Sequence, residues 1–278
     1  MRFAKNFFIG FYSMLITFTT LYINVEASNG LTLSNFDYVR YADTYPDLKQ
    51  AYGYDAQKLY THYITLGKPE GRIGMRTKAS YLDYSNFDAA RYAAENPDVM
   101  AAVGSSRNAL YKHFKEFGQF EGRQAWSTST DGNAKLKAYD VVASVTNGSM
   151  SETERIRAIH DWIVKNVRYN EVAYNTGNFS DSDYSAEGPL LLGTGVCSGY
   201  AEAFALCMDI IGVENRIPYS NDHAWNEVRL ADGRLLSIDV CWDDPIPDRG
   251  SEVYWYQYFL ITPEQMAGVE CHNKIGYY

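Results

Sequence analysis

Three residues in the second half of the chain, Cys197, His223 and Asp239, are of types that together can perform nucleophilic catalysis. A cysteine thiolate attacks carbonyl groups, a histidine carries the proton, and a carboxylate orients the histidine and stabilises its charged form. Each residue alone is weak evidence, because a lone cysteine is more often a buried structural residue. The sequence around each of them therefore decides between the two interpretations.

Cys197 stands just before an apolar run of helical length, Tyr200 to Ile211, which Gly212 ends. This run predicts a helix that carries Cys197 in its first turn. The unpaired backbone N–H groups and the dipole at a helix start stabilise a thiolate there. Small neighbouring residues would let a substrate come close to the sulfur: Gly195, Ser198 and Gly199.

His223 and Asp239 lie in two alternating runs on either side of a turn at 231–233, a pattern that predicts a β-hairpin. With a three-residue loop, Leu230 pairs with Arg234. In this register His223 and Asp239 are diagonal neighbours on one face of the hairpin, within reach of each other. A two-residue loop would put them on opposite faces, because side chains alternate with a period of two.

Three segments contain these residues: Gly-Val-Cys-Ser-Gly-Tyr-Ala-Glu-Ala-Phe at 195–204, His-Ala-Trp-Asn-Glu-Val at 223–228 and Ile-Asp-Val-Cys-Trp-Asp-Asp-Pro at 238–245. They resemble the core motifs of bacterial secreted transglutaminase-like proteins, in the superfamily of transglutaminases and papain-like proteases. The resemblance covers roughly the last half of the chain. It implies an α+β fold, with the nucleophile helix packed on an antiparallel sheet, and a catalytic triad of Cys197, His223 and Asp239.

The resemblance also implies a reaction, acyl transfer from amide bonds through a thioester on Cys197. We expect hydrolysis of peptide or isopeptide bonds in proteins or cell-wall peptides, since water needs no dedicated acceptor site. Cross-linking of a glutamine to a lysine-like amine uses the same triad, and the acceptor depends on the exclusion of water. A non-catalytic module that binds cell wall or protein is a further alternative. No metal ion and no organic cofactor is implied.

Three more residues are candidates for supporting or substrate-binding roles: Trp225, Tyr184 and Cys241. Trp225 shares the hairpin face of His223. Tyr184 falls in a polar segment, 171–189, that predicts a loop near the site mouth, although a solvated loop tyrosine is the more common case. Cys241 lies opposite His223 in the predicted register and is usually threonine in the resembling family. We expect it to line the site and to form a disulfide with Cys197 under oxidation.

Another histidine, His160, and the other cysteines carry less information. His160 lies beside the apolar stripe of a helix that a Ser151–Glu154 capping box starts, and we interpret it as structural. If Cys197 stays a free thiol, at most one disulfide forms among Cys207, Cys241 and Cys271, and the sequence leaves the pairing open.

Residues 1–27 have the pattern of a secretory signal peptide. Arg2 and Lys5 precede an apolar run, and Val25-Glu26-Ala27 offers a small-residue cleavage site. We therefore expect a secreted or cell-surface protein without a stable membrane span after cleavage; a retained anchor is the alternative, because the run approaches the length of a span. Removing these three charges changes the formal net charge from −9 to −10. Such an acidic chain argues against nucleic-acid binding.

The region 28–126 contains two units, about 35–74 and 86–125, that repeat with a period of 51 residues. Arg40-Tyr41-Ala42 recurs as Arg91-Tyr92-Ala93, and Glu70-Gly71-Arg72 as Glu121-Gly122-Arg123. Self-similarity at this period predicts duplicated supersecondary units, here an all-α region. The units resemble short repeats of secreted bacterial proteins, which suggests binding to cell-wall or cell-surface components.

Each unit carries one histidine, His62 or His113, which we interpret as a packing residue because no second metal ligand lies near it. A polar stretch at 127–133 predicts a linker. The catalytic domain would then comprise residues 134–278.

Overall fold

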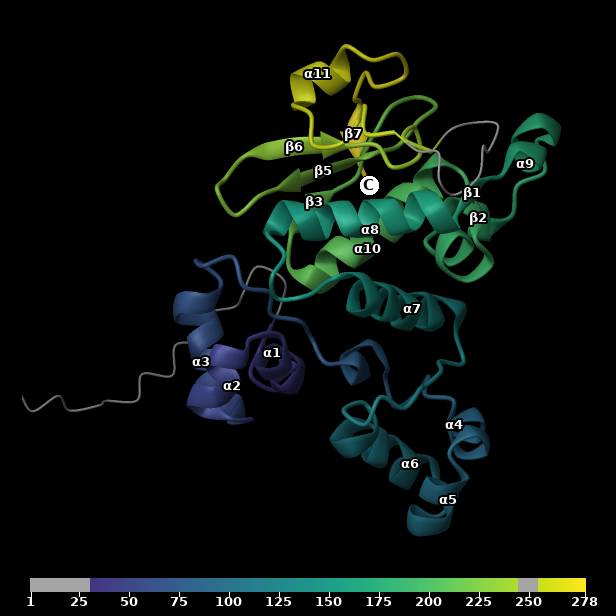
Figure 1. The fold of residues 1–278 in the computed structure, drawn as a ribbon. Helices are drawn as coiled ribbons and strands as arrows, with labels where there is room; N and C mark the ends of the chain where they lie inside the picture. Colours follow the sequence, from purple (N-terminus) through teal and green to yellow (C-terminus); the bar gives the residue numbers. More distant parts are fainter. Residues whose placement is uncertain (1–30, 245–254) are drawn as a thin grey trace, which may run out of the picture.

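The computed structural model describes residues 31–244 and 255–278 (Figure 1). The predicted signal peptide, 1–27, lies outside the described residues. Within the described ranges, no helix is both long enough and apolar enough to cross a bilayer.

The N-terminal part consists of two helical units whose elements lie 51 residues apart (Figure 1). The first comprises α1 (Tyr38–Thr44), α2 (Pro46–Tyr52), α3 (Ala56–His62) and the π-helical turn η1 (Tyr63–Gly67). The second comprises α4 (Ala89–Glu95), α5 (Pro97–Val103), α6 (Arg107–His113) and η3 (Phe114–Gly118). A 3-10 turn, η2 (Lys78–Tyr81), lies between them. Equal lengths and equal spacing agree with the duplication that the sequence predicts.

Each unit has its own small apolar core, and its histidine braces that core. The Tyr41 hydroxyl lies 3.1 Å from Nδ1 of His62, and Tyr92 makes the same contact with His113 at 3.1 Å. These contacts explain the positions of the His62 and His113 rings as packing residues.

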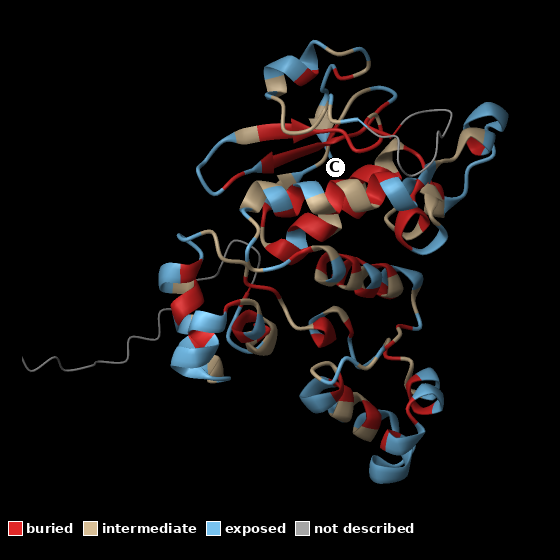
Figure 2. Cartoon of the chain, in the orientation of Figure 1, coloured by how far each residue is buried: buried red, intermediate tan, exposed pale blue. Residues whose placement is uncertain are grey.

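The C-terminal part is an α+β domain in which helices lie against one antiparallel sheet (Figure 1). The sheet has the strand order β3-β5-β6: β3 (Glu214–Arg216), β5 (Asn226–Arg229) and β6 (Leu235–Ile238). The long helices are α7 (Thr130–Val145), α8 (Glu152–Asn166) and α10 (Cys197–Ile211). Their buried faces and the sheet share one core cluster (Figure 2). The predicted fold class is confirmed.

Shorter elements complete the domain. They are β1 (Arg168–Tyr169) and β2 (Thr194–Gly195), which pair in parallel, β4 (Pro218–Tyr219) and β7 (Gly276–Tyr277), which pair antiparallel, and the helix α11 (Pro263–Ala267).

The helix α10 begins at Cys197 and ends at Ile211, and Gly212 follows in the left-handed conformation with φ 76°. Its central residues, among them Tyr200, Phe204 and Met208, are fully buried in the domain core. The apolar run that predicts this helix thus anchors it, so the first turn is held in place by the packing of the turns behind it.

The hairpin of β5 and β6 has the predicted register. Val228 pairs with Leu236 and Arg229 with Leu235, and the Leu230 N–H donates to the Arg234 carbonyl at 2.9 Å. Gly233 has φ 88°, which a residue without Cβ adopts without strain. The three-residue loop therefore sets which side chains share a face.

Two predictions about polar segments are wrong. The stretch 127–133 is not a linker, because α7 begins at Thr130 and the Ser129 side chain accepts the Gly132 N–H at 3.2 Å as its cap. The segment 171–189 is not a loop; it contains α9 (Glu171–Thr176), η4 (Asp181–Tyr184) and the first residues of η5 (Gly188–Leu192). In both segments, polar side chains that suggest loops instead bond the free N–H groups of helix starts.

The first unit and η2 contact the helices of the C-terminal domain through buried or partly buried polar groups. The Tyr139 hydroxyl donates to Asp37 Oδ2 at 2.9 Å, and Lys78 pairs with Asp140 at 2.6 Å. Arg155 donates to the Gly71 carbonyl at 2.8 Å. These contacts cross more than 60 positions of sequence and join the two parts of the molecule.

Candidate active site

The structure places Cys197 in the first turn of α10, half-buried and at the end of the helix where backbone N–H groups lack intrahelical partners. The turn η4 fixes this end, because the Val196 N–H donates to the Asp183 carbonyl at 2.9 Å. A Cβ on Gly199 would lie 2.5 Å from the same carbonyl oxygen. Glycine at 199 therefore allows the close approach of the two segments.

His223 lies in the loop that leads into β5, and Asp239 follows directly after β6. His223 Nε2 lies 2.6 Å from Asp239 Oδ2, and both side chains are buried. The Ser220 N–H donates to the His223 carbonyl at 2.8 Å and holds the loop. Since Nε2 is engaged with Asp239, Nδ1 is the ring nitrogen left for Cys197, which also hydrogen-bonds His223.

The surroundings of His223 favour its charged form. Burial alone would lower its pKa, but the Asp239 charge and hydrogen bond, followed by the hydrogen bond and charge of Cys197, raise the pKa of His223 to about 10. A thiolate and an imidazolium in contact are the reactive state of a cysteine nucleophile. The three residues that the sequence singles out are thus brought together, while their catalytic roles stay a prediction.

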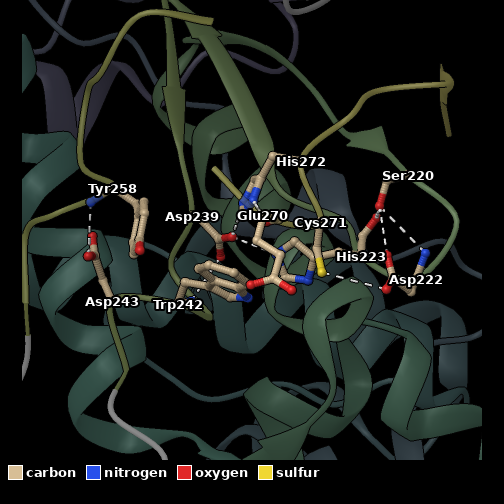
Figure 3. Close-up of polar contacts among 10 residues, drawn as sticks. All are labelled: Ser220, Asp222, His223, Asp239, Trp242, Asp243, Tyr258, Glu270, Cys271 and His272. Carbon is tan, nitrogen blue, oxygen red and sulfur yellow. Dashed lines mark hydrogen bonds and ion pairs between the residues drawn. The ribbon is translucent and has the colours of Figure 1, made fainter. Parts of the chain in front are cut away.

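Asp239 accepts hydrogen bonds on both carboxylate oxygens. Oδ1 accepts the Trp242 N–H at 2.9 Å, whereas Oδ2 lies 2.6 Å from His223 Nε2 and 2.8 Å from Nε2 of a second histidine, His272 (Figure 3). Burial would raise the pKa of Asp239, yet the charges and hydrogen bonds of the two histidines hold it well below its ordinary value. Asp239 therefore acts as an ionised group that two imidazoles share.

His272 is the site residue that the sequence does not reveal. It lies in the C-terminal tail between α11 and β7 and is fully buried. Its ring centroid lies 4.8 Å from those of His223, Trp225 and Trp242. No motif or spacing in the tail points to it, because Asp239, the carboxylate that it contacts, lies 33 residues earlier in the chain.

The three supporting candidates have different surroundings. Trp225 is buried, with its ring nearly parallel to that of His223 at 15° and 6.2 Å between centroids. Tyr184 lies on η4, is 47% exposed, and contacts the Phe179 ring at 5.2 Å. Cys241 is buried, and burial raises the pKa of its thiol well above the ordinary value. Cys197 and Cys241 are both free thiols, as are Cys207 and Cys271.

His160 has the structural position that the sequence suggests. It is fully buried on α8, with Nδ1 3.0 Å from Asp161 and Nε2 3.1 Å from Asp243. Asp243 also accepts the Tyr258 N–H at 3.1 Å, and the Asp239 N–H donates to the Tyr258 carbonyl at 3.0 Å (Figure 3). A polar network thus connects α8 to the backbone of Asp239.

His223, Asp239 and His272 are of residue types that also bind metals, and their polar atoms lie within 4.8 Å of one another. Both imidazoles, however, meet a single carboxylate oxygen at hydrogen-bond length. This is the geometry of two hydrogen bonds from imidazole N–H groups to one carboxylate oxygen, and we assign no metal to these three residues.

Comparisons with known proteins point to one superfamily. The family model of the transglutaminase-like superfamily matches residues 139–240. Kyphoscoliosis peptidase of Homo sapiens is 27% identical over 180 residues, which cover 56% of this chain and 26% of that protein. The chain thus spans about a quarter of the length of this relative.

Two solved structures are similar to part of this chain. One is a TGase, with 17% identity, a TM-score of 0.33 and coverage of 39% of this chain and 31% of that one. The other is a candidate cysteine protease from Cytophaga hutchinsonii, with 23% identity, a TM-score of 0.30 and coverage of 42% and 39%. Overlaps this small carry no argument. The family match is the firmer finding: residues 139–240, which match the model of the transglutaminase-like superfamily, contain Cys197, His223 and Asp239.

Proposed function

We propose that the protein is a cysteine-dependent enzyme that hydrolyses amide bonds of proteins or cell-wall peptides through an acyl thioester on Cys197. The observation that carries this proposal is the contact of the Cys197 thiol, in the first turn of α10, with a buried histidine that a carboxylate holds at 2.6 Å. A nucleophile, a base and an orienting group from three separate segments meet at one point.

The reaction would proceed in two halves. The Cys197 thiolate attacks the amide carbonyl, and the Cys197 N–H at the helix start is a candidate donor to the oxyanion that forms. Breakdown of this intermediate cleaves the C–N bond while the His223 imidazolium gives its proton to the leaving amine. Water then attacks the thioester, with His223 taking its proton, and the thiol and a carboxylic acid are released.

One observation and one chemical argument favour hydrolysis over amine transfer. The observation is that a relative with 27% identity is named a peptidase. The argument is that water requires no acceptor site, whereas an amine does. The proposed location is outside the cell, because residues 1–27 have the pattern of a signal peptide. The repeated units would then contact cell-wall or cell-surface material near the substrate.

The test is to incubate the purified protein with a peptide mixture that contains glutamine, in the presence of a labelled primary amine, and to analyse the products by mass spectrometry. We expect peptide bonds cleaved with the gain of water, and no product with a Cys197→Ala control. Incorporation of the amine would instead establish transamidation. No covalent product with any substrate, together with slow thiol alkylation, would refute the enzymatic proposal.

A further inference from the structure

We propose that His272 is a positioning residue that acts in its doubly protonated form, holding Asp239 in place and limiting how strongly Asp239 stabilises the charged form of His223. This inference rests on the proposed acyl-transfer function and adds a fourth residue to its machinery. His272 is remote from the other three in the sequence but shares an oxygen atom with His223.

The hydrogen-bond partners of His272 determine where its protons are. Nδ1 lies 2.7 Å from the Glu270 carbonyl oxygen, which can only accept, so Nδ1 carries a hydrogen. Nε2 lies 2.8 Å from Asp239 Oδ2, and an ionised carboxylate also only accepts. A ring that donates from both nitrogens is an imidazolium.

The surroundings hold this ring in one orientation. Three aromatic rings enclose it: Trp225 and Trp242 at 4.8 Å and Tyr258, nearly parallel to it, at 6.2 Å. The titratable groups that face it or its carboxylate partner are His223, Asp239, Tyr258, Cys241 and Asp243. Of these, only Asp239 touches His272 as an acceptor (Figure 3).

One carboxylate thus faces two imidazoles, with 4.8 Å between the ring centroids of His223 and His272. When His223 is charged, its attraction to Asp239 is partly offset by repulsion from His272. His223 therefore gives up its proton to a leaving amine more readily than a histidine that has a carboxylate to itself. Asp239, with both oxygens bonded, stays fixed while His223 loses and regains its proton.

The first test reads the protonation state of His272 directly and needs no substrate. The chain has five histidines, so the protein is labelled with ¹⁵N-histidine and the His272 signals are assigned by their loss in His272→Gln. We expect both ring nitrogens of His272 to carry the hydrogens that the contacts with Glu270 and Asp239 require. A neutral tautomer would overturn the proposal, whether or not the protein proves to be an enzyme.

The second test compares two variants that each keep one hydrogen bond. The amide nitrogen of His272→Gln can take the place of Nε2 and keep a donor for Asp239 without the charge. That of His272→Asn can take the place of Nδ1 and keep the Glu270 contact. The ¹⁵N spectra then give the pH at which His223 loses its proton in each folded variant.

In His272→Gln we expect this pH to rise by at least about one unit, because a positive neighbour has been removed. With a substrate in hand, kcat should fall at unchanged KM, and His272→Asn should lose more activity, since Asp239 is then unsupported on that side. A His223 titration that is the same in folded His272→Gln as in the parent protein would overturn the proposal.

Discussion

Removing the charge of Asp239 tests the reasoning about the site most directly. Burial would lower the pKa of His223, but the contributions of Asp239, followed by those of Cys197, raise it from an ordinary value of 6.5 to about 10. At 1.36 kcal/mol per unit, this corresponds to roughly 5 kcal/mol in favour of the imidazolium. Asp239→Asn keeps the size of the side chain but removes its charge. The Asp239 share of that stabilisation is therefore lost, and the pKa of His223 falls.

The assay is alkylation of Cys197 by iodoacetamide across pH, followed by peptide mass mapping, because the chain has four cysteines. In the parent protein, labelling of Cys197 should stay fast at pH 6, since the charged form of His223 lies beside its sulfur. In Asp239→Asn the alkylation rate of Cys197 at pH 6 should fall by roughly 100-fold. This factor is smaller than the full equilibrium shift described above. Cys197→Ala shows which signal belongs to this thiol.

The matched control is Asp232→Asn, which removes an exposed carboxylate from the turn of the same hairpin. Its labelling profile should coincide with that of the parent protein. If Asp239→Asn has a native circular dichroism spectrum and still labels at the parent rate at pH 6, Asp239 does not sustain the thiolate and the electrostatic account of the site is wrong.

Three further predictions concern stability. Gly199→Ala should lower the free energy of unfolding by about 1–3 kcal/mol, because the new Cβ would lie 2.5 Å from the Asp183 carbonyl oxygen. In urea titrations Gly268→Ala should cost less, because its nearest atom lies 3.3 Å away. Ser151→Ala removes the capping box of α8 and should cost about 1 kcal/mol; an unchanged denaturation midpoint would contradict the cap. The free energy of unfolding should fall as pH rises from about 6.5 to 10, because the pKa of His223 is raised on folding. Such a group stabilises the folded state fully below its pKa in the unfolded chain, and this contribution is lost as the pH rises through its pKa in the folded protein. The dependence on pH should be weaker in His223→Gln, and parallel curves for the variant and the parent protein would refute the prediction.

The parts of the molecule that local patterns determine could be predicted from the sequence. The apolar run behind Cys197 is sufficient to define α10, and alternation about Gly233 is sufficient to fix which hairpin residues share a face. The duplicated units follow from self-similarity alone. In each case, the residues that form the element lie close together in the chain.

Other parts depend on information that composition does not carry. Serine, asparagine and aspartate are typical of loops and also of helix caps, so the segments 127–133 and 171–189 were open to both interpretations. His272 required a fold-back of the tail onto Asp239, across 33 positions. The packing of Trp225 and Trp242 around it and its hydrogen bonds to Asp239 and Glu270 make that position specific.

The turn at 231–233 has a consequence for how the protein can vary between species. Ala231 and Asp232 are exposed, so their identities can vary, whereas Gly233 with φ 88° favours glycine. The number of residues in the turn cannot vary. A single inserted or deleted residue would rotate one strand by a side-chain position and point His223 away from Asp239. Homologous proteins that keep the activity should therefore differ in the amino-acid sequence of this turn but keep its length.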